Sequence, residues 1–387
     1  MSDSAATIAI IGGGQLGYML CEAAAGLGLR TLVVTPDADA PALRIADETM
    51  LTALDVDGLA GRIAAAADVV TFEFEAVTPV LLEALDAEDG IEIRPGTGIL
   101  RLIQNKALQK DWMVEHGIPT LPYYVFDKRP ADPAELLQHF DLPFVQKTQT
   151  GGYDGYGVQK IATQADLAKV WEAPSLLEPL IDLETEISVV VARDVAGATE
   201  AFPPVGVEAD PELNVLNVVV APADLADGIL ERAEAIAAAV VDKLGGVGIF
   251  AVEMFLTRDG ELLVNEIAPR VHNTGHHSLV ACSVSQFEQH MRAVAGMDLA
   301  PATTTHTALM RNLLYTDKLA SLLGHPAGQV DTPDPCVKLY WYGKIAAKPF
   351  RKMGHITGID MQPQEAHSRI DKALDEFLAS CDGALSA

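Results

Sequence analysis

The chain has 387 residues, of which 49% are hydrophobic and 21% charged, and its formal net charge is −27. This length predicts two or three domains. The acidic balance argues against a general nucleic-acid binder, because a phosphate backbone requires clustered Lys and Arg, although a local basic pocket could still bind a small phosphate ester. The four cysteines form no CxxC pair, and no apolar run approaches the roughly 20 residues of a membrane span. We therefore expect a cytoplasmic protein with no signal peptide and no membrane or nucleic-acid partner.

The first predicted unit opens with a strand at residues 7–11, a glycine turn, a helix to about residue 26 and a strand at residues 29–35. This order is typical of a Rossmann-like, doubly wound sheet. Gly12, Gly14 and Gly17 form a GxGxxG pattern, and Asp37 follows 20 residues after the last glycine. An NAD-linked oxidoreductase is therefore one hypothesis, but the same turn can bind other phosphate esters or only pack a helix on a strand.

The second predicted unit begins near Pro95-Gly96 with a helix that contains Asn105, Lys106 and Trp112. Strands at residues 144–148 and 158–161 follow, joined by a loop with four glycines. Backbone N–H groups in such a loop can close over phosphate oxygens, although an ordinary glycine-rich hairpin would have the same composition. Lys147 stands beside this loop, so Lys147 and Lys106 could contact one triphosphate. No GxxxxGK[ST] motif occurs, which excludes a P-loop.

The third unit contains a predicted hairpin, with strands at residues 248–257 and 261–267 around Arg258-Asp259-Gly260. A two-residue turn at Asp259-Gly260 would place Glu253 opposite Glu266. Two facing carboxylates repel unless a cation lies between them, and oxygen ligands without a nearby Cys favour Mg²⁺. A shifted register that separates the glutamates is the alternative.

Two later segments carry polar groups. His272 and His276 could bind a metal only on a helix, and the intervening Asn273-Thr274-Gly275 instead predicts a loop that binds a substrate. Four cations then occur within nine residues near glycines and a proline: Lys344, Lys348, Arg351 and Lys352. This loop is a candidate clamp for a phosphate monoester, and a solvated basic face is the ordinary alternative.

Five motifs stand in a fixed order: GGGQLG (12–17), FEFE (72–75), GGYDGxG (151–157), NEIAPRxHNTGH (265–276) and GKxxxKPFRKMGH (343–355). Together they resemble the ATP-grasp superfamily and, within it, the 5-(carboxyamino)imidazole ribonucleotide synthase family. The resemblance implies a mixed α/β and α+β fold, with a Rossmann-like domain at 1–98, a small flap domain at 99–175 and a larger domain at 176–387. It implies an ADP-forming ligase of purine biosynthesis that uses ATP, Mg²⁺ and bicarbonate to carboxylate 5-aminoimidazole ribonucleotide through carboxyphosphate. A homodimer is also implied.

The resemblance also assigns roles to residues. ATP contacts fall on Lys106, Lys147, Gly152, Tyr153, Asp154, Gly155, Gly157, Glu178, Ile181, Glu186, Asn265 and Glu266. It assigns the metal to Glu253 and Glu266. It assigns the place where the amine and carboxyphosphate meet to Tyr153, Arg270, His272 and Asn273. The ribonucleotide falls on Gln15, Leu16, Glu73, Lys344, Arg351 and Lys352.

One position departs from the family pattern. Tyr156 stands where these enzymes commonly carry Lys or Arg, and tyrosine keeps a hydrogen-bond donor without the charge. A non-catalytic nucleotide-sensing or scaffolding protein is therefore one alternative. A formate-dependent glycinamide ribonucleotide transformylase is another, but its first loop normally has Glu in place of Gln15. Biotin-dependent carboxylases share the nucleotide site but do not explain the basic loop.

Overall fold

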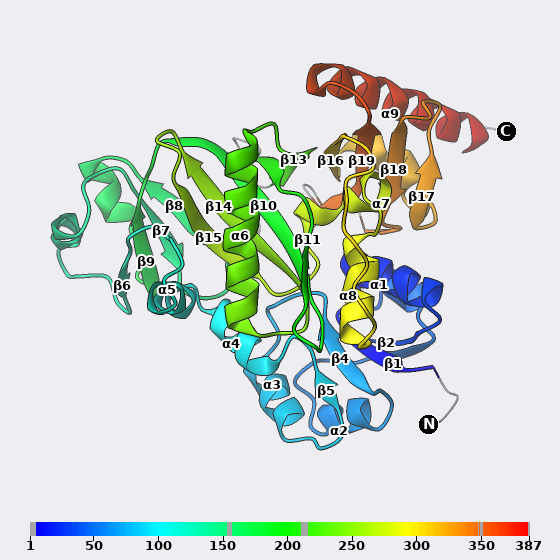
Figure 1. Ribbon diagram of the computed structural model, residues 1–387, viewed down its shortest axis with the longest axis horizontal. Coiled ribbons are helices and arrows are strands. Elements are labelled where there is room, and N and C mark those ends of the chain that lie inside the picture. The colour runs from blue at the N-terminus through cyan, green and yellow to red at the C-terminus, as the bar shows by residue number, and fades with distance from the viewer. Residues whose placement is uncertain (1–4, 153–156, 210–215, 347, 349–350, 386–387) are drawn as a thin grey trace.

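The computed structural model describes residues 5–152, 157–209, 216–346, 348 and 351–385, and its strands form three sheets (Figure 1). The first is a parallel five-stranded sheet in the order β3-β2-β1-β4-β5, as the Rossmann-like pattern predicted. Ile8 to Ile11 are fully buried because helices cover both faces of a parallel sheet. The elements of this unit are β1 (Thr7–Ile11), α1 (Gln15–Gly26), β2 (Arg30–Thr35), η1 (Pro41–Arg44), β3 (Glu48–Leu51), α2 (Leu59–Ala64), β4 (Val69–Phe72), α3 (Pro79–Asp86), β5 (Glu92–Ile93) and α4 (Thr97–Gln104).

The second sheet is antiparallel and has four strands in the order β6-β9-β7-β8. Its elements are α5 (Lys106–Glu115), β6 (Tyr124–Phe126), η2 (Pro133–Gln138), β7 (Phe144–Thr148), β8 (Val158–Ile161), η3 (Gln164–Lys169) and β9 (Ser175–Pro179). Asn105 was predicted inside the helix, but it caps α5 instead, because its side chain accepts hydrogen bonds from the first turn. The domain boundary predicted at residues 175/176 falls inside β9, which pairs with β6 and β7 of this sheet.

The third sheet has ten strands in the order β15-β14-β10-β12-β13-β16-β19-β18-β17, with β11 paired to β10. In Figure 1, helix α6 lies across β10 and β14, and α9 lies over β16, β18 and β19. The elements are β10 (Leu183–Arg193), β11 (Thr199–Ala201), β12 (Val205–Ala209), β13 (Leu216–Ala221), α6 (Asp227–Leu244), β14 (Gly248–Thr257), β15 (Leu262–Ala268), η4 (Asn273–Gly275), α7 (Ser278–Ala281), α8 (Gln286–Val294), β16 (Ala308–Leu314), η5 (Asp317–Leu322), β17 (Gly328–Asp331), β18 (Val337–Trp341), β19 (Lys352–Ile359) and α9 (Pro363–Leu385).

The turn of the β14–β15 hairpin differs from the prediction. The N–H of Thr257 donates to the carbonyl of Glu261 (2.9 Å), so the loop is the three residues 258–260 and not two. Gly260 takes a left-handed φ of 78° because a three-residue hairpin loop ends in that conformation. By itself this turn would place Glu253 opposite Asn265. A bulge at Asn265 shifts the register by one residue and restores the pairing of Glu253 with Glu266.

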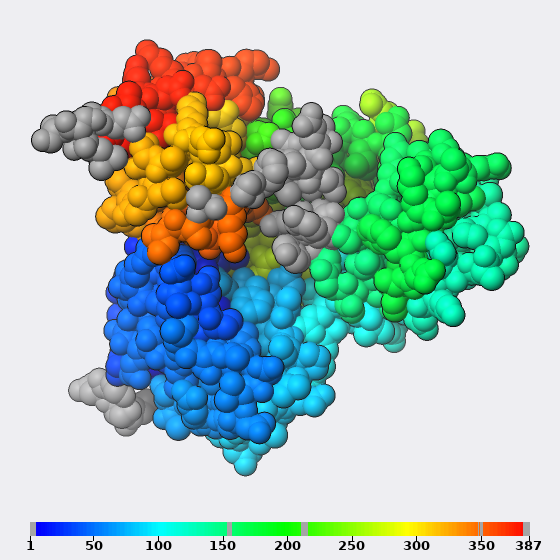
Figure 2. All heavy atoms as spheres, turned by 180° about the vertical axis from the view of Figure 1, so that it is seen from behind, coloured from blue at the N-terminus to red at the C-terminus, as the bar shows by residue number. Residues whose placement is uncertain are grey.

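The first unit packs directly against the third. The imidazole of His290 on α8 lies 2.8 Å from the hydroxyl of Thr71 on β4, and its other nitrogen accepts from the N–H of Ile249 (3.1 Å). Arg44 donates to the carbonyl of Gly343 (2.6 Å), which fixes the segment around residue 343 to the first unit. Figure 2, seen from behind, shows the blue first unit beneath the orange segment. In the part of the chain that is described, no helix is both long and apolar enough to cross a membrane.

Candidate active site

Glu253 and Glu266 face each other on the side of the sheet that points away from α6. On the opposite side of these strands, Val252, Val264 and Ile267 belong to a buried apolar cluster that includes residues of α6. Burial, followed by repulsion from Glu266 and Glu186, raises the pKa of Glu253 to about 7. A pair of acidic groups in this condition is suited to a bound cation.

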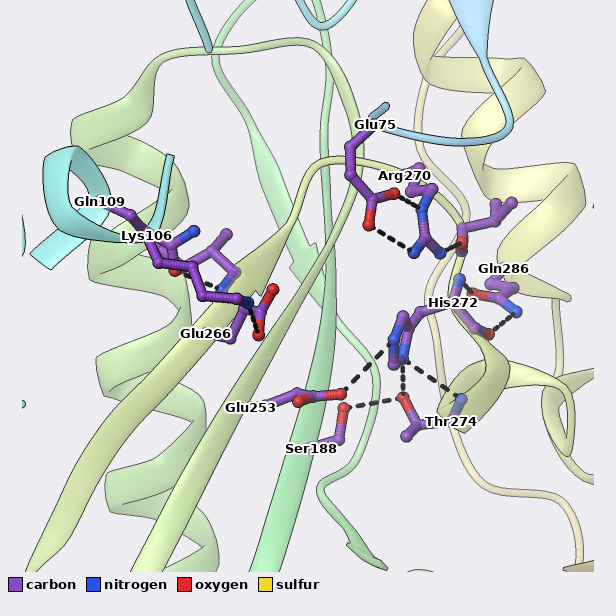
Figure 3. A network of polar contacts seen from close by, with 12 residues as sticks. Glu75, Lys106, Gln109, Ser188, Glu253, Glu266, Arg270, His272, Thr274 and Gln286 are labelled. Atoms are coloured by element: carbon purple, nitrogen blue, oxygen red, sulfur yellow. Dashed lines mark hydrogen bonds and ion pairs between the residues drawn. The ribbon is translucent and has the colours of Figure 1, made fainter. Parts of the chain in front are cut away.

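The surroundings of the pair fit a magnesium ion bound together with phosphates. Lys106 lies 2.6 Å from Glu266, and the Nε2 atom of His272 lies 3.5 Å from Glu253 (Figure 3). Among the described residues, no three or more His, Cys, Asp or Glu side chains form a metal cluster. Two carboxylates would leave the remaining coordination positions to water and substrate oxygens, which is how Mg²⁺ is usually bound.

A chain of lysines runs beside the carboxylates. Lys147 on β7 lies 2.6 Å from Glu178 and donates to the side chain of Asn265 (2.8 Å). Lys110 on α5 lies 2.5 Å from the other oxygen of Glu178 and donates to Thr120 (2.6 Å). Burial would raise the pKa of Glu178, but Lys147 and Lys110 outweigh it and the pKa is lowered. Lys106, Lys147 and Asn265 are therefore brought together as the sequence predicted.

Sequence reasoning missed Lys110, although its spacing of four residues from Lys106 on one helix was a usable signal. The structure also limits how Glu178 could contact ATP. Both of its carboxylate oxygens bind lysines, so its main chain is what remains for a nucleotide. Ile181 lies in the connection between β9 and β10, and burial raises the pKa of Glu186 on β10.

Arg270 and Asn273 occupy the segment after β15. The guanidinium of Arg270 forms an ion pair with both oxygens of Glu75, one of them 3.1 Å away, and donates to the carbonyl of Val271 (3.0 Å). Burial would raise the pKa of Glu75, but Arg270 holds it at about 2. Glu75 lies in the FEFE motif and received no role from the sequence. Both polar side-chain atoms of Asn273 are buried without a hydrogen-bond partner in the described structure, which indicates a position for a ligand.

The loop predicted around His272 is confirmed. His272 is extended, with φ −129° and ψ 155°, and only the short η4 turn follows it. The imidazole of His272 lies 2.9 Å from the hydroxyl of Thr274, which in turn lies 2.8 Å from that of Ser188. His276 is buried elsewhere, against the rings of Phe287 and His355. The two histidines do not share a helix face, so they form no i,i+4 metal site.

Glu73 occupies the turn that resembled a dinucleotide site. The N–H groups of Gly14 and Gly17 donate to its two carboxylate oxygens, at 2.5 and 2.6 Å. A Cβ atom on Gly12 would lie 2.2 Å from the Glu73 side chain, so the glycine admits this carboxylate. These amides are the donors that a dinucleotide phosphate would use. The protein's own carboxylate takes the place of that phosphate, which argues against an NAD-binding turn.

Burial raises the pKa of Glu73, while Lys344 and Arg270 act in the opposite direction, so both cations lie near it. Gln15 and Leu16 begin α1 beside this carboxylate and are half-buried. Lys344 donates to the carbonyl of Lys352 (2.8 Å) and lies 5.4 Å from the centre of the Tyr342 ring.

Only 7% of Lys344 is exposed, so a solvated basic face does not describe this lysine. Arg351 donates to the carbonyl of Ala346 (3.1 Å) within the same loop. Lys352 begins β19 and is half-buried.

The predicted flap is described only at its two ends. Tyr153, Asp154, Gly155 and the atypical Tyr156 lie outside the described residues. Gly152 and Gly157 border them, and Gly157 has a left-handed φ of 76°. A Cβ atom on Gly157 would lie 2.4 Å from the Thr148 hydroxyl, so glycine is required at that end of the loop.

Comparisons with known proteins agree with this arrangement. Three family descriptions match in order: the ribonucleotide synthetase preATP-grasp domain at residues 5–104, the ATP-grasp domain at 111–287 and the phosphoribosylaminoimidazole carboxylase C-terminal domain at 308–369. The chain is 39% identical to the N5-carboxyaminoimidazole ribonucleotide synthase of Synechococcus elongatus, over 90% of this chain and 88% of that protein.

Two solved structures are similar over almost the whole chain. An ADP complex of N5-carboxyaminoimidazole ribonucleotide synthetase has a TM-score of 0.86 and 32% identity, covering 96% of this chain and 97% of that one. The Aspergillus clavatus enzyme, in complex with ADP and 5-aminoimidazole ribonucleotide, has a TM-score of 0.83 and 28% identity, covering 96% and 98%.

Proposed function

The chain belongs to the N5-carboxyaminoimidazole ribonucleotide synthase family of ATP-grasp ligases, and from this membership we propose how its own residues perform the reaction. It is an ADP-forming enzyme of purine biosynthesis that carboxylates 5-aminoimidazole ribonucleotide in an ATP-dependent reaction. We assign the reaction to this site because of the pair Glu253 and Glu266, which Lys106 and Lys147 flank on the side of the small antiparallel sheet.

The proposed reaction has two steps. An oxygen of bicarbonate attacks the γ-phosphorus of ATP, the bond to the β-phosphate oxygen breaks, and ADP and carboxyphosphate form. The exocyclic amine of the ribonucleotide then attacks the carboxyl carbon, inorganic phosphate leaves, and the nitrogen loses a proton. Neither step needs a covalent enzyme intermediate, so the protein acts by positioning and by neutralising charge.

Each residue group has a matching role in this proposal. Lys106 and Lys147 would bind ATP phosphates, and Glu253 with Glu266 would hold Mg²⁺, which supplies further neutralisation of phosphate charge when bound. Arg270 and the unsatisfied amide of Asn273 would meet carboxyphosphate between the two substrates. We also propose bicarbonate as the carboxyl donor, a homodimer and a cytoplasmic location, each supported by the family membership.

The ribonucleotide would lie between the first and third units. Glu73 is anchored at the start of α1, and Lys344 lies close enough to affect its pKa. This places an acceptor for hydroxyl groups near a buried cation, which suits a ribose phosphate. Gln15 and Leu16 would border the same pocket, and Arg351 and Lys352 would add positive charge near the phosphate.

The test is phosphate release from ATP with bicarbonate and 5-aminoimidazole ribonucleotide, added separately and together. We expect release to require the ribonucleotide and the carboxyamino product to form when bicarbonate is present. A parallel reaction with glycinamide ribonucleotide and formate is the control. Turnover in that control alone would assign the chain to the transformylase reaction instead.

A further inference from the structure

Gln286, the first residue of α8, holds both polar groups of the His272 main chain. Its side-chain oxygen accepts from the N–H of His272 (2.8 Å), and its side-chain nitrogen donates to the carbonyl of His272 (2.6 Å). One amide therefore replaces the neighbouring strand that an extended residue would otherwise pair with. Figure 3 shows Gln286 reaching His272 from α8, on the side opposite Glu253. Gln286 is fully buried.

The chain around Gln286 is shaped to admit this side chain. A Cβ atom on Gly275 would lie 2.4 Å from the oxygen of Gln286, so any larger residue there would displace the amide. The N–H of Gln286 donates to the hydroxyl of Ser278 (2.9 Å), which fixes the start of α8. The side-chain nitrogen also lies 3.3 Å from the Nδ1 atom of His276. The amide thus has a partner at each end and little freedom to turn.

We propose that Gln286 is a positioning residue: it fixes the main chain of His272, and thereby places the imidazole between Glu253 and Thr274. The proposal rests on the proposed function, in which His272 lies beside the metal carboxylates and the reacting groups. The imidazole lies 3.5 Å from Glu253 and 2.9 Å from the hydroxyl of Thr274. Since His272 is an isolated extended residue, the Gln286 amide supplies the rigidity that strand pairing would give.

The chain contains a matched control on the same helix. Gln289 is also fully buried, accepts from the N–H of Ala300 (3.0 Å) and donates to its carbonyl (2.6 Å). The two glutamines therefore make the same pair of hydrogen bonds from the same helix, one to the active-site segment and one to a connection after α8. A purely structural role would make their substitution equivalent in effect.

The experiment compares Q286M with Q289M, since methionine keeps the side-chain length and removes both hydrogen bonds. We expect similar losses in Tm, because each variant leaves a main-chain N–H and C=O without their partner. Only Q286M should reduce kcat for the carboxyamino product, by about tenfold to a hundredfold, with KM for ATP changed less than about twofold. An equal loss of kcat in Q289M would overturn the proposal.

A double-variant cycle tests whether Gln286 acts through His272. Adding Q286M to H272A should slow the reaction no further than about twofold, because the imidazole to be positioned is gone. Effects that multiply in the double variant would contradict the proposal. If Q286M does not fold, Q286E replaces it: the carboxylate can accept from the His272 N–H but repels the His272 carbonyl, so the same selective loss of kcat is expected.

Amide hydrogen exchange on the wild-type protein needs no substrate, so it tests the positioning role of Gln286 separately from the proposed carboxylation activity. The His272 amide should be protected as strongly as that of Ala300, and fast exchange at His272 would overturn the positioning role. Wild-type turnover separately decides the proposed function. A protein that lacks carboxylation activity but protects His272 would contradict only the proposed function.

Discussion

Glu253 and Glu266 lie directly opposite each other on adjacent antiparallel strands, and the bulge at Asn265 puts them there. Leu262 and Val264 belong to the buried apolar cluster that includes α6, and Ile267 joins the same cluster after an odd interval of three residues. A regular strand would have turned Glu266 toward the core. The bulge lets the apolar residues stay buried while both carboxylates emerge on the opposite face.

We predict that E253Q stabilises the metal-free protein at alkaline pH. The folded-state pKa of Glu253 is raised from 4.5 to about 7, so the metal-free fold binds a proton more tightly than the unfolded chain. Wild-type stability from this group is therefore present below pH 4.5 and is lost as pH rises through 7. Because 34% of the side chain is exposed, solvent screening reduces the effect to roughly 1–2 kcal/mol.

Urea unfolding with EDTA at pH 5 and pH 8 measures this difference. E253Q should also lose the stabilisation that added Mg²⁺ gives the wild type. E48Q, at an exposed glutamate, is the control and should retain it. An E253Q protein that is less stable than wild type at pH 8 and still responds to Mg²⁺ would contradict the carboxylate-pair interpretation.

Loss of Lys110 should destabilise the fold more than loss of a surface lysine or arginine. Lys110 and Glu178 have side chains only 3% and 2% exposed, so K110M leaves a buried carboxylate with Lys147 as its single cation. We expect a loss of about 3 kcal/mol in the free energy of unfolding. R30M breaks the exposed pair with Glu48 and should cost about 0–1 kcal/mol. Equal losses in chemical denaturation would show that burial does not set the strength of the Lys110 pair.

The ion pair between Glu75 and Arg270 should matter for catalysis and much less for ATP binding. E75Q keeps the shape of the side chain but removes the charge that orients the guanidinium, so we expect kcat to fall about tenfold. KM for ATP should change little, because Lys106 and Lys147 lie on other elements. Exposed Glu83 on α3 provides the control E83Q. An E75Q protein with wild-type kcat and a raised KM for ATP would reverse this assignment.

The pH dependence of that variant gives a second readout. The pKa of Glu75 is about 2, so this carboxylate stays ionised throughout the range in which the enzyme can be assayed. E75Q should therefore lower the rate without moving the pH at which the rate falls on the acid side of the profile. A displaced acid limb would mean that Glu75 titrates during turnover.

His290 should make the fold sensitive to acid. Burial lowers its folded-state pKa from 6.5 to about 3, so protons bind the unfolded chain first. Stability from this group is therefore present above pH 6.5 and is lost as pH falls toward 3, by about 1.4 kcal/mol per pH unit. In urea unfolding between pH 6 and pH 4, the free energy of unfolding of H290Q should fall less steeply than that of the wild type, by about the same 1.4 kcal/mol per pH unit. H139N, at an exposed histidine, should follow the wild-type slope.

Much of the local structure could be predicted from the sequence. The bounds of β1, β7, β8 and β14 match the predicted strands, because each is a short run of β-formers with a Gly or Pro close to at least one of its ends. The facing glutamates were also predicted, but from a two-residue turn that does not exist. Two deviations of one residue, in the turn and at Asn265, cancel. The odd interval between Val264 and Ile267 was the one signal of the bulge in the sequence.

The remaining features depend on contacts between distant segments. Glu73 accepts from the N–H of Gly14, which lies 59 residues before it at the start of α1, and Glu75 meets an arginine 195 residues away. No local pattern encodes such pairs, because they exist only after the first unit packs on the third. The sequence by itself determined the elements, the order of the motifs and the chemistry of the side chains. The tertiary structure alone decided that the glycine turn binds the Glu73 carboxylate, and that Gln286 holds His272, because both contacts form only when the segments that carry them have packed together.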